Sequence, residues 1–262
     1  MSLRLLLLLS AGILMTFAPA RAQESTDDAP ADDLIMALDD AIFTNEDAPI
    51  LEALKAILQA VNAEPDSYAL NIAAAKGYLA RADLLRVDRQ TGKVDKAREK
   101  AMRAQQALWG EKGAEHAEKA KRLATTKQEK SEAYRLCGEC TVHRIDGPLS
   151  GMRYGPTAKS DIEFAVSQDS TNWQARRAQG LMFLNNPPIN GGDLDKAVET
   201  FALCAKNDEQ HADVHHAFLA QAWMKLKRPE RAKLEVQKSL LKNPANRLAN
   251  NIKARLQENK QW

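Results

Sequence analysis

The sequence predicts an all-α fold in which antiparallel helix pairs stack into an α-solenoid that ends in a C-terminal capping helix. Apolar residues recur three and four positions apart almost without interruption after residue 33, and few stretches alternate at period two as half-buried strands do. Small side chains recur in the same phase from one helix pair to the next, and prolines and glycines recur where pairs would meet. A coiled coil is excluded because no heptad persists through these breaks.

The first 22 residues have the pattern of a secretory signal peptide. A single early base, Arg4, precedes an apolar stretch that includes an unbroken leucine run at 5–9. The run 18–22, Ala-Pro-Ala-Arg-Ala, supplies small residues at cleavage spacing. The apolar stretch is shorter than the roughly 18–20 residues that span a bilayer, which argues against a retained anchor. We expect cleavage after Ala20 or Ala22, a periplasmic or secreted protein, and no transmembrane span afterwards.

Charge is distributed unevenly along the mature chain. Removal of residues 1–22 takes away two of the 37 bases and no acid, which leaves 35 of each. Residues 23–66 hold twelve acids and one base, and 23–33 are predicted to be a disordered acidic leader. Residues 225–260 hold eleven bases and three acids. Export argues against nucleic acid as the partner of this basic end. An acidic partner, anionic lipid in a peripheral envelope association, and an ordinary solvated face stay open.

The clearest helix pair lies at 213–246. Two antiparallel helices can approach closely only where side chains are small, and Ala220 and Ala232 supply that contact. Larger apolar residues fill the adjoining holes, and a proline stops the second helix because it lacks an N–H. The order small, aromatic, alanine, apolar, small, proline is carried by Ala220, Trp223, Ala232, Val236, Ser239 and Pro244.

Earlier segments repeat the second-helix part of this pattern at intervals of 35 and 39 residues. The matching triplets are Ala197, Phe201 and Cys204; Ala158, Ile162 and Ala165; and, near the N-terminus, Ala53, Ile57 and Ala60. The helices expected from the whole pattern are 31–43, 49–62, 66–86, 93–108, 113–144, 156–168, 172–185, 193–206, 211–226, 229–242 and 245–259, of which 113–144 is open to division into two.

These repeats resemble the tetratricopeptide repeat (TPR) family, with the best match over 173–246. The runs 151–156 and 187–193 also resemble a group of bacterial exported TPR proteins of unassigned role. The resemblance implies a right-handed superhelix with a concave, partner-binding groove. We expect degenerate repeats over 34–130 and regular TPR-like repeats plus the capping helix over 131–262. Residues 111–128 fit no repeat, which puts regular curvature in doubt there.

The resemblance also implies that the first helix of each pair lines the groove. Long polar donors there, mixed with two apolar residues, suit an extended peptide or an acidic tail of a partner protein. An exposed, merely solvated face is the alternative. The groove positions carried onto this sequence are Arg135, Glu139, His143, Gln174, Arg177, Leu181, Asn185, Ala217, Gln221, Met224 and Lys225.

Cysteines and histidines raise the question of chemistry. Cys137 and Cys140 form a C-x-x-C that follows predicted helix, where the repeat wants small packing residues. Core packing is favoured, a structural disulfide is the next alternative, and redox catalysis comes last. Cys204 replaces a recurring small core residue. No zinc pattern with two ligand pairs is present, since His143 stands alone after the pair, so we expect no metal site.

The loop 185–193 has two interpretations. It contains Pro-Pro and Gly-Gly, so it is either a rim that contacts a ligand or turn chemistry before a helix capped by Asp193, with Ile189 left ambiguous. The leading hypothesis for function is an exported scaffold that binds a protein or peptide, with no cofactor and no enzymatic activity. The alternative is a solute-binding accessory protein with a pocket closed by inter-helix loops, under Ile189 and Met152. A thiol enzyme is a third hypothesis.

Overall fold

The computed structural model describes residues 31–91, 94–259 and 262. The predicted signal peptide at 1–22 lies outside these residues, as does the predicted acidic leader up to residue 30. Residues 31–33, which the sequence analysis placed both in the leader and at the start of the helix expected at 31–43, form the first turn of that helix. No helix within the described ranges is long and apolar enough to cross a membrane.

The described chain is built from eleven α-helices and one short 3-10 helix, and no strand occurs in it, so the all-α prediction is confirmed. The helices are α1 (Ala31–Phe43), α2 (Asp47–Ala63), α3 (Tyr68–Thr91), α4 (Lys96–Leu123), α5 (Lys127–Val142), α6 (Pro148–Gln168), α7 (Trp173–Asn185), η2 (Pro188–Asn190), α8 (Leu194–Asn207), α9 (Ala212–Lys225), α10 (Pro229–Lys242) and α11 (Arg247–Glu258).

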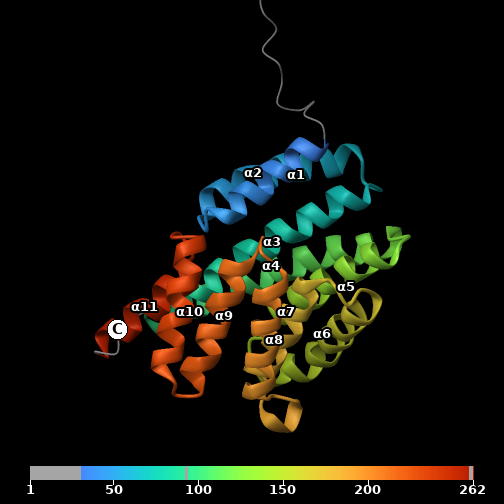
Figure 1. Ribbon diagram of the computed structural model, residues 1–262. Coiled ribbons are helices and arrows are strands. Elements are labelled where there is room, and N and C mark those ends of the chain that lie inside the picture. The colour runs from blue at the N-terminus through green and yellow to red at the C-terminus, as the bar shows by residue number, and fades with distance from the viewer. Residues whose placement is uncertain (1–30, 92–93, 260–261) are drawn as a thin grey trace, which may run out of the picture.

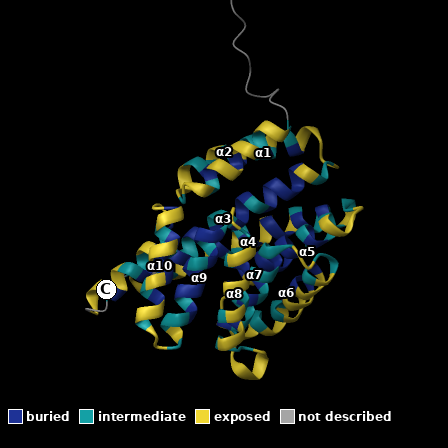
Figure 2. Cartoon of the chain, viewed as in Figure 1, coloured by how far each residue is buried: buried dark blue, intermediate teal, exposed yellow. Residues whose placement is uncertain are grey.

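Consecutive helices pack as antiparallel pairs, and the pairs stack into a solenoid (Figure 1). The first helix of each pair contacts the first helix of the next, so α1, α3, α5, α7 and α9 form the inner layer. Exposed residues lie on the outer faces of α6, α8 and α10 (Figure 2). Helix α11 buries Ala249, Ile252 and Leu256 and packs on α9 and α10, as a capping helix does.

Small residues stand at the contacts between helices, as the sequence predicts. Ala197, Ala220 and Ala232 have no exposed surface. A Cβ added at Gly180 would come within 2.7 Å of the Phe201 ring, so only glycine allows this approach of α7 and α8. Close packing of this kind lets short helices bury a continuous apolar layer.

The predicted break at 109–112 is wrong, because α4 runs continuously from Lys96 to Leu123. Its glycines are contact points with α5 and do not end the helix. A Cβ at Gly110 would lie 2.6 Å from the Cys140 carbonyl oxygen, and a Cβ at Gly113 would lie 2.6 Å from the Cys140 Sγ. The true break follows at Thr126, whose side chain caps α5 in a capping box with Glu129.

Helix α6 begins at Pro148, eight residues before its predicted start, so the expected loop up to Pro156 is wrong. Pro148 occupies the first turn, where a missing N–H costs nothing. Pro156 lies inside the helix on its exposed side. Water can therefore satisfy the carbonyl that loses its partner, which explains why the helix continues through this proline.

The two ends of the array meet. Helix α3 is 24 residues long and reaches across to contact α11. The Arg247 Nη1 lies 2.9 Å from both carboxylate oxygens of Asp88, and the Asn243 side-chain amide donates to the Phe43 carbonyl at 3.2 Å. The meeting of the ends closes the array around its concave face, where the sequence suggested an open groove, and the cavity inside stays partly open to solvent.

Candidate functional site

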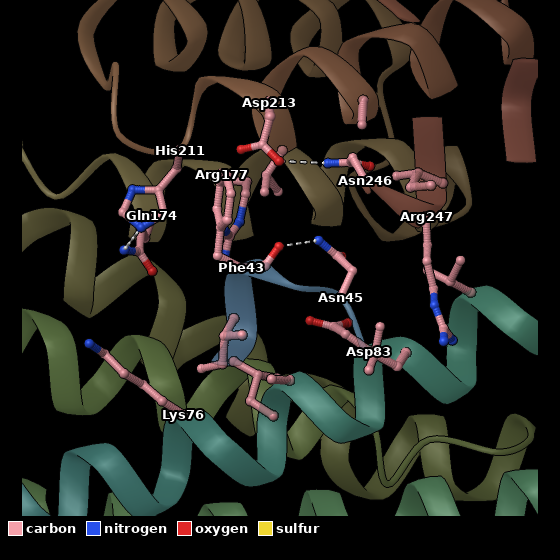
Figure 3. Close-up of a pocket in the computed structure, with 18 of the residues that line it drawn as sticks. Phe43, Asn45, Lys76, Asp83, Gln174, Arg177, His211, Asp213, Asn246 and Arg247 are labelled. Atoms are coloured by element: carbon pink, nitrogen blue, oxygen red, sulfur yellow. Dashed lines mark hydrogen bonds between the residues drawn. The ribbon is translucent and has the colours of Figure 1, made fainter. Parts of the chain in front are cut away.

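A cavity of about 390 Å³ lies on the inner side of the closed array. Its wall takes residues from α1, α3, α5, α7, α9 and α11, so every member of the inner layer and the capping helix contributes (Figure 3). The volume lies in the range of small-molecule pockets, and it also accommodates a few side chains of an extended segment. We call this cavity the central pocket.

One wall of the central pocket is a chain of buried charges on α5 and α7. The Arg135 side chain is 1% exposed and forms ion pairs with Glu132 and Glu139. Burial raises the pKa of Glu132, but the adjacent Arg135 guanidinium outweighs burial and lowers it to about 2. Arg177 extends the chain, with Nη2 3.2 Å from the Glu139 Oε1. Each charge of this largely buried wall therefore lies next to a charge of the opposite sign.

Arg177 is incompletely satisfied. Its side chain is 11% exposed, and its buried Nε has no hydrogen-bond partner. Figure 3 shows the side chain in the interior of the pocket, reaching toward the end of α1. A guanidinium donates along two planar edges, and the Nε of Arg177 is a buried donor without a partner, so the surroundings of this side chain leave part of its hydrogen-bonding capacity unused.

The opposite wall comes from α3. Asp83 accepts from the Arg86 Nη2 at 2.8 Å, and its carboxylate lies 3.2 Å from the His143 Nε2. Burial raises the pKa of Asp83, but Arg86 and His143 outweigh it and hold the pKa well below its usual range. Lys76, earlier on the same helix, lies 3.5 Å from Asp39 of α1.

A third wall joins α7 to α9 through histidines. The His211 Nδ1 lies 3.0 Å from an Asp208 oxygen, and its Nε2 lies 3.1 Å from the Gln174 Nε2. A neutral His211 that donates to Asp208 and accepts from Gln174 satisfies both contacts. His215 also faces Asp208, at 2.9 Å, and burial lowers the pKa of His215, which favours its neutral form.

Between these walls the lining is apolar. Phe43 at the end of α1 is 55% exposed, although it lies within the array, because it borders the cavity. Leu79 of α3, Leu181 of α7 and Phe218 of α9 complete this surface. The central pocket is therefore lined by one incompletely paired arginine, Arg177, and by an apolar floor.

About half of the predicted groove residues line the central pocket, namely Arg135, Glu139, Gln174, Arg177 and Leu181, together with Ala217. His143 instead lies behind the wall, 5% exposed, between Asp83 and Gln106. Lys225 donates to the Leu184 carbonyl at 2.7 Å and to Asn185, at the end of α7 away from the pocket. Gln221 and Met224 do not line the pocket either, and Met224 packs in the C-terminal core.

The sequence did not predict the pocket residues that come from the N-terminal helices and from the C-terminal helix. These are Phe43, Lys76, Asp83, Arg86 and Arg247. Degenerate repeats before residue 130 gave no groove positions, although the small residues Ala75 and Ala82 show that α3 packs like any first helix. Arg247 could not be found, because its role depends on the meeting of the two ends.

Cys137 and Cys140 of the C-x-x-C are free thiols in this structure. Cys137 donates to the Glu118 carboxylate at 3.0 Å, while Cys140 faces α3 and α4. Burial raises the pKa of both thiols, which is the opposite of what a redox nucleophile needs. The geometry supports the packing interpretation, and Cys204 is likewise buried, with a pKa raised by burial to about 11.

Glu118, Cys137 and Asp161 bring three potential metal-ligand atoms within 4.8 Å of one another. Lys121 lies against them, with Nζ 2.9 Å from Glu118 and 3.1 Å from Asp161. Burial lowers the pKa of Lys121, but the two carboxylates and the thiol outweigh burial and raise it. The ammonium group is therefore the cation of this cluster.

Ile189 and Met152, which were expected to cover a solute pocket, lie on the surface of the described chain. Ile189 is 92% exposed, Met152 is 70% exposed, and neither borders the central pocket. The Gly-Gly-Asp half of the loop is turn chemistry, since Gly191 has φ +88° and Asp193 caps α8 by accepting from Asp195 and Lys196.

Comparisons with known proteins identify the fold. No family model matches the chain, and no curated protein matches it in sequence. The crystal structure of TTC0263, a thermophilic TPR protein of Thermus thermophilus, is similar with a TM-score of 0.59 and 13% identity, over 87% of this chain and 98% of that one. This likeness shows that the chain has a TPR-like α-solenoid fold.

Proposed function

We propose that the protein is an exported scaffold of the bacterial cell envelope, which holds a short acidic segment of a partner protein in the central pocket. The observation that carries the proposal is the placement of Arg177, a largely buried and incompletely paired guanidinium that lines the cavity on the concave face. A carboxylate of the partner accepts from the Arg177 guanidinium, and the apolar floor takes the neighbouring side chains. An arginine edge suits a planar carboxylate particularly well.

The shape and size of the central pocket support a segment rather than a globular surface. A volume of about 390 Å³ receives only a few side chains. Most of the affinity would then come from a small number of buried groups, as at the hot spots of other interfaces. The TPR-like fold supports a protein as the partner, since this fold is typical of interaction scaffolds.

A photo-reactive residue placed at Leu181, inside the pocket, tests the proposal against one placed at Leu203 on the outer helix α8. We expect cross-linking to a defined envelope protein from position 181 only. Arg177→Gln should abolish it, while the matched Arg176→Gln on the same helix, whose side chain donates to the Ser170 carbonyl, should not. The same products from both positions would reject the pocket as the binding site.

Export is tested separately. The protein recovered from the periplasm or medium should have an intact mass that corresponds to a chain starting at Arg21 or Gln23. A full-length chain found only in the cytoplasm contradicts the proposed location.

A small anionic solute is the second candidate, favoured by the closure of the array around the pocket. Native mass spectrometry of protein purified from its own cells distinguishes the two. A bound species of small-molecule mass, lost in Arg177→Gln but kept in Arg176→Gln, supports the solute in place of the segment.

A further inference from the structure

Three exposed aliphatic residues lie on, or just after, the turns that join the two helices of a pair. Ile189 is 92% exposed, Leu149 is 79% exposed and Met152 is 70% exposed. Leu149 and Met152 lie near the start of α6, three positions apart and thus on one face, and Ile189 lies in η2 between α7 and α8. They are among the most exposed large apolar side chains of the described chain, and the central pocket uses none of them.

These turns lie on the same edge of the array. The first helices α5, α7 and α9 stack on one another in order, so the turns that follow them come out on one side. Figure 1 shows the α7–α8 and α9–α10 turns together at the bottom of the molecule. We define the turn edge as residues 142–155, 186–196 and 225–231.

The loop that carries Ile189 is rigid. Backbone amides of Asn190, Gly191 and Gly192 donate to the carbonyls of Pro187 and Pro188, and the Asp193 amide donates to the Phe183 carbonyl at 2.8 Å. Gly191 adopts φ +88°, and a Cβ at Gly192 would overlap the Asn186 carbonyl. A backbone this constrained still presents an isoleucine to solvent, although exposure of an aliphatic side chain is unfavourable.

The second apolar site carries fixed cations beside it. The Arg144 guanidinium lies 4.2 Å from the centre of the Tyr154 ring and donates to its hydroxyl at 3.2 Å. Arg153 lies 5.1 Å from the centre of the same ring. Both positive charges are thus held close in the chain to Leu149 and Met152 by cation–π contacts.

The turn edge is basic, and the opposite edge is not. The turn edge contains seven bases and four acids. The turns on the opposite edge, at 166–174, 205–213 and 240–247, contain three bases and four acids. The three aliphatic side chains therefore protrude from the positively charged edge. The opposite edge, which has no excess of bases, also carries an exposed aliphatic side chain, Leu241, which is 85% exposed.

We propose that the turn edge docks the protein onto an anionic lipid surface, with Ile189, Leu149 and Met152 inserted at the boundary of headgroups and acyl chains. Separate protruding aliphatic residues accompanied by bases suit a lipid interface. A protein interface of high affinity would instead centre on a packed, buried cluster. This proposal is independent of what the central pocket binds, and docking by this edge leaves the inner face of the array free.

Vesicle flotation tests the proposal with a chain that starts at Gln23, which keeps every described residue. We expect the chain to float with vesicles that contain phosphatidylglycerol and not with pure phosphatidylcholine vesicles, and we expect salt to weaken the association. Ile189→Asp should lower the partition coefficient about tenfold, and Leu149→Asp with Met152→Asp should lower it further.

Matched variants separate insertion from charge. Leu241→Asp, and Leu234→Asp with Leu241→Asp, add the same negative charge at exposed aliphatic positions away from the turn edge, and they should keep at least about half of the wild-type binding. Circular dichroism checks that all variants keep their helices. Absence of flotation with anionic vesicles overturns the proposal. Equal losses for the two sets of variants also overturn it, because the effect would then be charge alone, and so would flotation unaffected by the turn-edge variants.

Discussion

The two halves of the array share their small packing residues but differ in helix length and in buried charge. Helices α3–α6 are 16 to 28 residues long, whereas α7–α10 are 13 or 14. In both halves alanines separate the helices and a serine hydroxyl donates to a buried carbonyl of the neighbouring helix. The long half adds glycines that contact backbone atoms, and buried charges on α5 that pair with one another and with Arg177 of α7. Regular stacking needs only small residues. The greater length of the helices in the long half lets α3 contact α11 and close the array, and it brings charged side chains to the pocket wall.

The largest expected difference concerns buried polar groups. Arg135→Met in the long half leaves Glu132 and Glu139 without their main partner, so we expect a loss of about 3–5 kcal/mol in the free energy of unfolding. Ser239→Ala in the short half removes one hydrogen bond to the Asp213 carbonyl and should cost about 1 kcal/mol. Urea denaturation measures both. Equal losses would mean that the charged network is no more important than a single hydroxyl.

Acid should remove a stabilising contribution of Glu132 in the long half. The pKa of Glu132 is lowered to about 2 from its ordinary 4.5, so its ion pair stabilises the fold above about pH 4.5 and this contribution disappears as the pH falls toward 2. We expect about 3 kcal/mol of stability to be lost over this range through Glu132. Denaturant unfolding of Glu132→Gln at several pH values should show a free energy of unfolding that falls less steeply with decreasing pH than in the wild type. A fall as steep as in the wild type would exclude Glu132 as a main cause.

Glycine contacts provide an intermediate effect. A methyl group at Gly110 meets the Cys140 carbonyl oxygen at 2.6 Å, and backbone cannot move cheaply. At Gly180 the nearest atom, at 2.7 Å, belongs to the Phe201 ring, which can tilt. We expect Gly110→Ala to cost about 2–3 kcal/mol and Gly180→Ala about 1–2 kcal/mol.

Gly155→Ala is the matched control, since nothing lies within 4 Å of a Cβ there. Alanine should stabilise that helix position by up to about 1 kcal/mol. Thermal unfolding ranks the three variants, and a ranking with Gly180 first would show that the ring contact is the stiffer of the two.

The contact between the ends should be the weakest. The side chains of the Arg247–Asp88 pair are 35% and 47% exposed, so Arg247→Ala should change global stability by less than about 1 kcal/mol. It should nevertheless speed amide hydrogen exchange in α11 and at the end of α1. Lys242→Ala, which breaks an exposed pair with Glu209 elsewhere in the C-terminal half, should leave the α1 amides unchanged. Faster exchange at α1 in both variants would argue against a specific contact between the ends.

The sequence predicts the helices of the short half better than those of the long half. In the short half, the alanine register and the proline and aspartate caps are local signals, and the expected helices at 229–242 and 193–206 agree with α10 and α8 to within a residue. In the long half, separate helices were expected at 93–108 and 113–144, although Gly110 and Gly113 lie within the continuous α4 and contact α5. About half of the predicted groove residues line the pocket, because inner-layer positions can be carried from repeat to repeat. The pocket residues that were missed come together only because of the curvature of the whole array. Every helix pair contributes to this curvature, so no short sequence pattern indicates it.

The meeting of α3 with α11 fixes how many repeats this protein can have. An open solenoid tolerates the gain or loss of a unit, because each repeat contacts only its neighbours. Here a sixth pair would displace α11 from α3 and leave Asn243 without the Phe43 carbonyl, and a missing pair would leave a gap. Repeat proteins ordinarily lengthen by duplication of a repeat, and in this chain such a duplication would break the contacts between the two ends.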